Sequence, residues 1–224
     1  MPDTVPAKGG TLAAAAGLAA VLAGSVLMGL LHVGTVDEVD PVRRTISEYA
    51  LGPGKWVFDT AVLLIAAGSA AIFGTLVHRE QVRAGGITTL GAAAWTLGLL
   101  TVVVFPKTDW SVGPSLGGTI HRYASVVAFV GLPVAVLAAR AVHRHSPVLR
   151  IATGVLAAAS LAWFGVILAA VGLMLTGGEP WWRAIPLGLV ERGMAATEVA
   201  ALVALSLGSV RARTPVVAPP LVGS

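Results

Sequence analysis

The residues best suited to chemistry lie in a late apolar segment, GLVERGMAATE, from Gly188 to Glu198. Glu191 and Glu198 are seven residues apart and so share one face of a helix. An ionisable side chain inside an apolar helix is costly, which points to a functional role. Two interpretations stay open here. Glu191 can belong to a structural ion-pair network with Arg122 or Arg192, or Glu198 can be a buried proton-carrying group.

A second polar motif, FPKTDWSVGPSLGGTIHRYASVVAF, covers residues 105–129. His121 and Ser125 are four residues apart and lie on the same face of a helix, whereas Arg122 points about 100° away from His121. Histidine at the end of an apolar helix is typical of a hydrogen-bonded interfacial residue, and it is also a candidate ligand or catalytic group.

Histidines and carboxylates from four separate segments suggest a metal site as an alternative. Two imidazoles with two or more carboxylates can bind zinc or another divalent cation, and the cation would activate water for hydrolysis. No compact signature such as HExxH is present, so only the residue types support this hypothesis. The candidate metal ligands are His32, Asp109, His121 and Glu191.

The longest polar stretch, PVRRTISEYALGPGKWVFD, covers residues 41–59. Its TISE motif fits a capping box, and the following Gly-Pro pair is a helix stop in which the glycine takes the left-handed conformation. These signals predict a short surface helix over residues 46–51 that lies across the outer mouth of the protein. Ser47 is a hydroxyl beside Glu48 but has no nearby base, so a nucleophilic role has little support.

The composition restricts the class of protein. Of 224 residues only 12% are charged, and the mean hydropathy is +0.84, which an ordinary soluble domain does not reach. The chain is therefore expected to be an integral membrane protein. It has no cysteine, which excludes disulfides and thiolate sites. Its basic residues are scattered singly between apolar runs, so no nucleic-acid partner is expected.

Six apolar runs are long enough to cross a hydrocarbon core of about 30 Å. They predict an all-α fold: a polytopic membrane protein with a six-transmembrane-helix bundle and short loops. The expected organisation is a cytoplasmic leader (1–10), a transmembrane domain (11–208) and a disordered cytoplasmic tail (209–224). The predicted spans are residues 11–33, 56–77, 86–105, 119–142, 149–176 and 184–207.

Small residues at four-residue spacing predict close helix packing within this bundle. The pairs are Ala13/Gly17, Ser25/Gly29, Ala94/Gly98 and Gly165/Ala169.

The distribution of charge predicts the orientation. With an even number of spans both termini lie on one side, where eight Lys and Arg residues fall against five in the opposite loops. This favours a multi-pass protein of the plasma (inner) membrane with both termini cytoplasmic. Nine of the eleven acidic residues then lie in the outer loops or the outer-facing spans, so chemistry is expected on the extracytoplasmic side.

Three motifs in order, SEYALGPGKW, then FPKTDW followed by HRYASVVAF, then GLVERG, resemble the domain of unknown function 998 family of bacterial and archaeal membrane proteins. The resemblance covers residues 24–207. It implies a six-span bundle with polar motifs on one side and no established activity. The layout is more distantly similar to the Frag1/DRAM/Sfk1 membrane proteins, for which lipid-related roles have been proposed. The positions that the resemblance marks are Ser47, Glu48, Pro106, Asp109, His121, Glu191 and Arg192.

The leading hypothesis is a membrane protein with an outer-facing polar pocket that binds a lipid headgroup or a small ligand. The alternatives are a membrane-embedded metal-dependent hydrolase and a proton-coupled transporter that uses Glu198; catalysis is otherwise unassigned. Membrane lipids are the expected partners, no cofactor is expected, and a divalent metal belongs only to the hydrolase alternative. The candidate ligand-binding residues are Ser47, Glu48, Asp59, Asp109, His121, Arg122, Glu191, Arg192 and Glu198.

Overall fold

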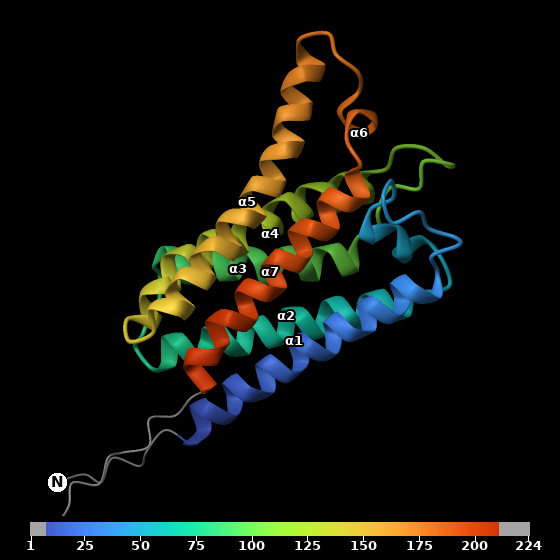
Figure 1. The fold of residues 1–224 in the computed structure, drawn as a ribbon. Coiled ribbons are helices and arrows are strands. Elements are labelled where there is room, and N and C mark those ends of the chain that lie inside the picture. The colour runs from blue at the N-terminus through green and yellow to red at the C-terminus, as the bar shows by residue number, and fades with distance from the viewer. Residues whose placement is uncertain (1–7, 211–224) are drawn as a thin grey trace, which may run out of the picture.

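The computed structural model describes residues 8–210, and within them the chain is helical with no strand (Figure 1). The predicted all-α class is therefore confirmed. The predicted tail lies almost wholly outside the described residues, as does most of the predicted leader. In chain order the elements are α1 (Lys8–Gly34), η1 (Ile46–Leu51), α2 (Lys55–His78), α3 (Ile87–Val104), α4 (Leu116–Ala139), η2 (Arg140–His143), α5 (Pro147–Leu175), α6 (Trp181–Ala184) and α7 (Leu187–Val210).

Five helices in the described part of the chain are long and apolar enough to cross a membrane. They are the predicted first five spans, and they belong to α1, α2, α3, α4 with η2, and α5. The predicted sixth span corresponds to α7, a helix of 24 residues in the same bundle. It contains Glu191, Arg192 and Glu198 and is not among the five.

Close backbone contact joins the helices into two hairpins, α1 with α2 and α3 with α4. A Cβ added to Gly68 would lie 2.5 Å from the backbone oxygen of Gly17, and one added to Gly98 would lie 2.8 Å from that of Ala124. Two of the predicted small-residue pairs, those with Gly17 and Gly98, therefore do mark helix contacts. Gly29 and Gly165 have open space where a side chain would be, so the prediction is wrong for those pairs.

The core lies along the middle of the bundle, where α7 packs against the hairpins. Ile72 and Leu76 of α2, Leu132 of α4, and Leu202 and Leu205 of α7 are fully buried and belong to one cluster. Large apolar side chains elsewhere are exposed on the helix surfaces, as expected for groups that face lipid rather than water.

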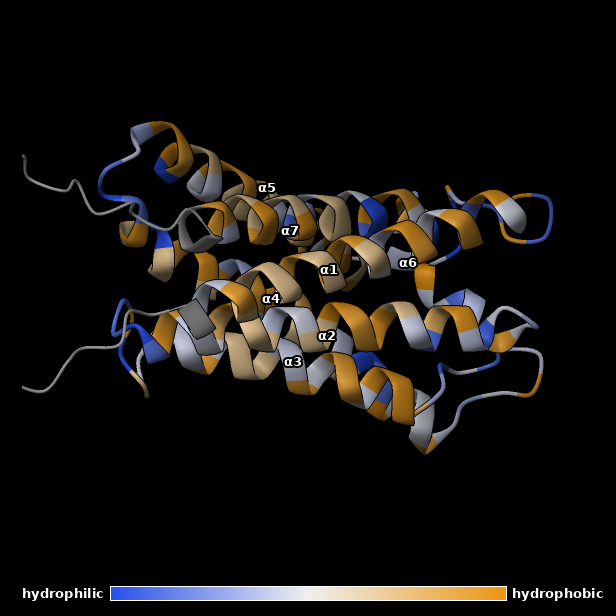
Figure 2. Cartoon of the chain, turned by 90° about the horizontal axis from the view of Figure 1, so that it is seen from below, coloured by the Kyte–Doolittle hydropathy of each residue, from blue (hydrophilic) through white to orange (hydrophobic). Residues whose placement is uncertain are grey.

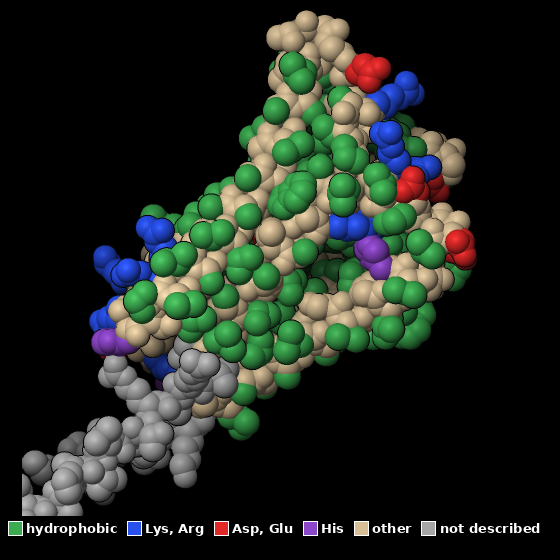
Figure 3. Space-filling view, in the orientation of Figure 1, with side chains coloured by type: hydrophobic (Ala, Val, Ile, Leu, Met, Phe, Trp, Pro, Cys, Tyr) green, Lys and Arg blue, Asp and Glu red, His purple; other side chains and the backbone are tan. Residues whose placement is uncertain are grey.

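Polar segments gather at the two ends of the bundle, and the middle is mainly apolar (Figure 2). The acidic end holds η1, the α3–α4 loop (residues 105–115) and α6. The basic end holds the α2–α3 loop (residues 79–86) and η2. In the view of Figure 3, acidic side chains are visible only at the acidic end. The second half of α5 leans away from the other helices toward α6 (Figure 1).

The first loop contains the predicted short helix, but its capping box is wrong. The segment Ile46–Leu51 is a 3-10 helix, and Thr45 makes no side-chain cap. Its hydroxyl instead accepts from Lys107 Nζ at 2.8 Å, and the same ammonium donates to the Glu48 carboxylate. Gly52 is also not left-handed, since its φ is −113°.

Candidate functional site

A cavity of about 600 Å³ lies between α7 and the two hairpins. Its walls are mainly apolar and aromatic, from helices α1, α2, α3, α4 and α7: Met28, Phe58, Ile65, Trp95, Phe129 and Val199. Its polar lining includes His32, Ser47, His121, Ser125, Glu191 and Arg192. The space-filling view shows a hollow on the side of the bundle, beside a histidine and a basic side chain (Figure 3).

Arg192 connects α7 to three other segments at this polar end. Its Nε donates to the His32 ring on α1, and its Nη2 donates to the Tyr49 hydroxyl of η1 at 3.0 Å. Its Nη1 donates to the backbone oxygens of Arg44 at 2.6 Å and Gly188 at 3.0 Å. The guanidinium also lies 5.8 Å from the centre of the Tyr49 ring, within cation–π range. Arg192 therefore fixes η1 over the cavity.

Glu191 holds the same loop through its carboxylate. Its Oε2 accepts from the backbone amide of Ile46 at 3.0 Å, so it satisfies a donor at the start of η1. The predicted ion pair of Glu191 with Arg122 or Arg192 is wrong. No such pair is formed within the described residues, because Arg192 is engaged by His32 and Tyr49 and Arg122 is exposed.

His121 is buried in α4 with one ring nitrogen engaged and the other free. Its side chain is 4% exposed, and Nδ1 lies 2.8 Å from the backbone oxygen of Phe105. Nε2 is buried and has no hydrogen-bond partner. Because a carbonyl oxygen only accepts, Nδ1 carries a hydrogen, and Nε2 of the neutral ring is an acceptor. The hydroxyl of Ser125 donates to the backbone oxygen of His121 at 2.9 Å and not to its ring.

A charged cluster lies beside the cavity. Lys107 contacts Glu48 and Thr45, and the Lys107 and Glu48 side chains are only 16% and 20% exposed. Arg44 approaches Glu48 from the solvent side at 3.6 Å. Glu48 is therefore a structural partner of Lys107, while its neighbour Ser47 lines the cavity. The Ser47 hydroxyl lies 3.2 Å from that of Thr45 and has no base beside it to make it a nucleophile.

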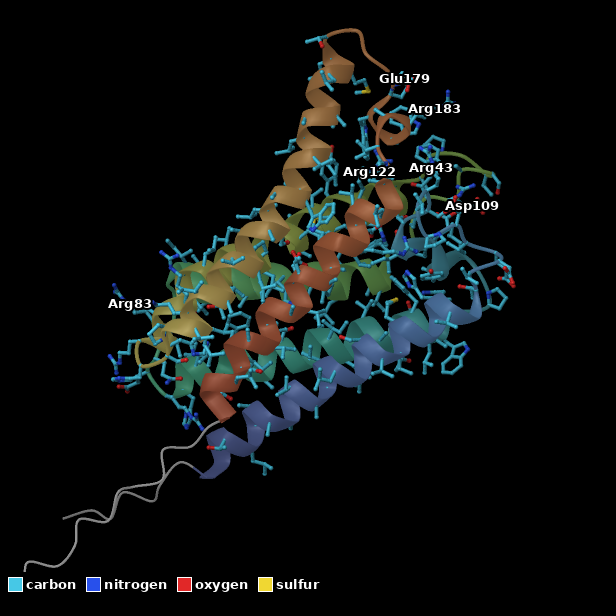
Figure 4. All side chains as sticks on the ribbon, viewed as in Figure 1. Arg43, Arg83, Asp109, Arg122, Glu179 and Arg183 are labelled. Atoms are coloured by element: carbon cyan, nitrogen blue, oxygen red, sulfur yellow. The ribbon has the colours of Figure 1, made fainter. Side chains whose placement is uncertain are left out.

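Two predicted carboxylates do not line this cavity. Asp59 pairs with Lys55 one turn earlier on α2, at 2.6 Å. Asp109 is on the exposed α3–α4 loop (Figure 4), where its Oδ1 accepts from the hydroxyl and the amide of Ser111. Those hydrogen bonds, the hydroxyl first, hold the pKa of Asp109 below its usual range.

Two further candidates also lie elsewhere. Arg122 is exposed, and its guanidinium lies 5.9 Å from the centre of the Trp110 ring. Glu198 is 1% exposed, and its Oε1 accepts from the Ser160 hydroxyl of α5 at 3.0 Å, while Oε2 has no partner. Glu198 therefore belongs to the contact between α5 and α7 and does not line the cavity.

The geometry does not support the hypothesis of a metal site. Among the described residues no group of three or more His, Asp or Glu side chains is placed to hold an ion. His32 is bonded to Arg192, Glu191 to Ile46, and Asp109 is exposed on its loop, so three of the four proposed ligands have other partners.

The sequence did not identify two residues that the site depends on. Tyr49 is 3% exposed, and its ring meets that of His32 edge to face at a centroid distance of 5.2 Å. Lys107 was not among the candidate residues. Its position within FPKTDW, one of the motifs of the resemblance, was the available signal.

The helices and their apolar surfaces define an all-α, multi-pass membrane protein. A family model described as "Protein of unknown function (DUF998)" matches residues 13–208, and the chain therefore belongs to that family, as its three motifs predicted. Nothing matches the chain among curated proteins, and nothing matches among solved structures. The more distant similarity to Frag1/DRAM/Sfk1 proteins stays a prediction.

Proposed function

We propose that this protein is a six-span protein of the plasma membrane that binds a lipid in the cavity beside α7, with the lipid headgroup at the acidic end. The observation that carries the proposal is the division of the cavity into apolar walls and a polar end. Its volume of about 600 Å³ falls within the range of about 300–1,000 Å³ that is usual for ligand pockets.

The position of the cavity favours a lipid over a water-soluble ligand. Four of the five helices that form its walls, α1, α2, α3 and α4, have the length and hydropathy of membrane spans, and its hollow is visible on the side of the bundle (Figure 3). A ligand there replaces lipid contacts with protein contacts along its tail. Its headgroup then reaches His121, whose Nε2 atom a hydrocarbon tail would leave unpaired.

The proposed orientation includes α7 as the sixth span and both termini in the cytoplasm. The basic end supports it, because exposed arginines gather there and no carboxylate pairs with them among the described residues. They include Arg140, Arg144 and Arg150, which line a recess of about 650 Å³ between η2 and α5.

The orientation can be tested with single cysteines because the chain has none of its own. Asp109→Cys at the acidic end and Arg83→Cys at the basic end are both on exposed loops (Figure 4). A membrane-impermeant maleimide should label Asp109→Cys in intact cells and Arg83→Cys only after permeabilisation. The reverse pattern would invert the proposed orientation.

Lipid binding can be tested by filling the cavity. Ala196 of α7 lines it, so Ala196→Phe should exclude a lipid tail and leave the polar end intact. Ala138 on α4 is exposed and does not line the cavity, so Ala138→Phe is the matched control. With a photoactivatable diacylglycerol in nanodiscs, we expect labelling of the cavity helices to fall about tenfold in Ala196→Phe only. Equal labelling of both variants would overturn the proposal.

The alternative functions have no comparable support. The hydrolase lacks a gathered set of metal ligands within residues 8–210, and the carboxyl group of Glu198 is separated from the cavity that a transported substrate would occupy.

A further inference from the structure

The hydrogen-bond donors at the polar end of the cavity are largely used within the protein. Arg192 directs its guanidinium to His32, Tyr49 and two backbone oxygens, so four of its five N–H groups are engaged. Ser125 donates to the backbone of its own helix, and so does Ser25 on α1. Ser47 shares a hydrogen bond with the Thr45 hydroxyl, so most of the donors that line this end already have a partner.

The acceptors at the same end are not all used. His121 Nε2 has no partner although the side chain is buried, and its Nδ1 hydrogen is fixed by Phe105. Glu191 uses Oε2 for the amide of Ile46. Both side chains line the cavity. An occupant that donates a hydrogen bond to the Nε2 atom should therefore bind about tenfold more tightly than one that leaves it unpaired.

From this imbalance we infer that the cavity selects an uncharged lipid whose headgroup donates a hydrogen bond, namely a hydroxyl-bearing lipid such as a diacylglycerol. The inference rests on the proposed function and adds the chemistry of the headgroup. Its hydroxyl donates to His121 Nε2, and its acyl chains lie against the apolar wall.

A phosphate headgroup fits the same end poorly. It brings acceptors and negative charge to a place where the buried polar atom without a partner, His121 Nε2, is itself an acceptor. Arg192 cannot turn to meet a phosphate without leaving Tyr49 and the backbone oxygen of Arg44 unpaired. Lys107 does not line the cavity and is held by Glu48.

The test compares three competitors with the same acyl chains against the photoactivatable diacylglycerol in neutral-lipid nanodiscs. The competitors are a diacylglycerol, its methyl ether and a phosphatidic acid. We expect the diacylglycerol to compete about tenfold better than the methyl ether, because only the alcohol donates to His121. This comparison uses the unmodified protein and does not depend on a variant that folds.

A variant then assigns the effect to one atom. His121→Phe keeps a ring and removes Nε2. The affinity of the diacylglycerol should therefore fall to that of the methyl ether, while the affinity of the methyl ether stays the same. Equal competition by alcohol and ether in the unmodified protein, or stronger competition by phosphatidic acid, would overturn the headgroup inference alone. If none of the three competes for the site, the proposed lipid-binding function fails with it.

Discussion

Replacement of Arg192 by Gln should loosen α7 from the segment that covers the cavity. The guanidinium donates to three groups outside its own helix: the His32 ring, the backbone oxygen of Arg44 and the Tyr49 hydroxyl. A hydrogen bond that involves a charged group contributes about 1.5–3 kcal/mol. Three independent bonds would sum to about 4.5–9 kcal/mol, but they share one half-buried side chain and are not additive. We expect Arg192→Gln to lower the free energy of unfolding by about 3 kcal/mol.

The assay is thermal unfolding of the purified protein in one detergent. For a chain of this length about 1 kcal/mol corresponds to 2–4 °C, so Arg192→Gln should lower the midpoint by about 6–12 °C. Arg183→Gln is the control, because Arg183 is exposed on α6 and makes the same change of charge at the same end (Figure 4). Equal midpoints for the two variants would refute the assignment of Arg192 as the residue that holds η1.

The remaining predictions concern packing, a buried carboxyl and a loop pKa. Gly68→Ala places a Cβ 2.5 Å from a backbone oxygen of α1 and should lower the free energy of unfolding by about 1–3 kcal/mol. Gly74→Ala meets open space and should raise the free energy of unfolding by about 0.5–1 kcal/mol. The thermal midpoints of the two variants should therefore move in opposite directions. Glu198→Gln keeps an acceptor and the side-chain volume, so its thermal midpoint should stay within about 2 °C of that of the unmodified protein. Glu198→Ala leaves a cavity and should lower the thermal midpoint by more than that. Ser111→Ala should raise the pKa of Asp109 toward its usual value, as measured by carboxyl NMR titration.

The helices could be predicted because a bilayer imposes their length. Each predicted apolar run coincides with a helix, and the first differs from α1 by three residues at its start, Lys8 against Thr11. The fourth helix is less regular than predicted: α4 ends at Ala139 and continues as the 3-10 helix η2. Hydropathy alone does not reveal such a change, because the exposed Arg140 and Ala141 carry no turn signal.

The site could be predicted only in part. Sequence reasoning selected His121, Glu191 and Arg192, which line one cavity, because polar groups in apolar helices are rare enough to stand out. It could not pair them, since the partners of Arg192 come from α1, the first loop and η1. The capping box failed for a related reason. A local motif was outweighed by Lys107, which is 59 residues from Glu48.

The same contacts restrict how a ligand reaches the cavity. Entry through the acidic end would break the bond from Ile46 to Glu191 and those from Arg192 to Arg44 and Tyr49, each worth about 1.5–3 kcal/mol. Entry from the side of the bundle, where Figure 3 shows the hollow, disturbs mainly apolar contacts that lipid replaces at little cost. A molecule that takes the side route must already be dissolved in the bilayer. The loop held by Glu191 and Arg192 is therefore a second argument for the proposal that the occupant is a lipid, and it does not depend on the headgroup.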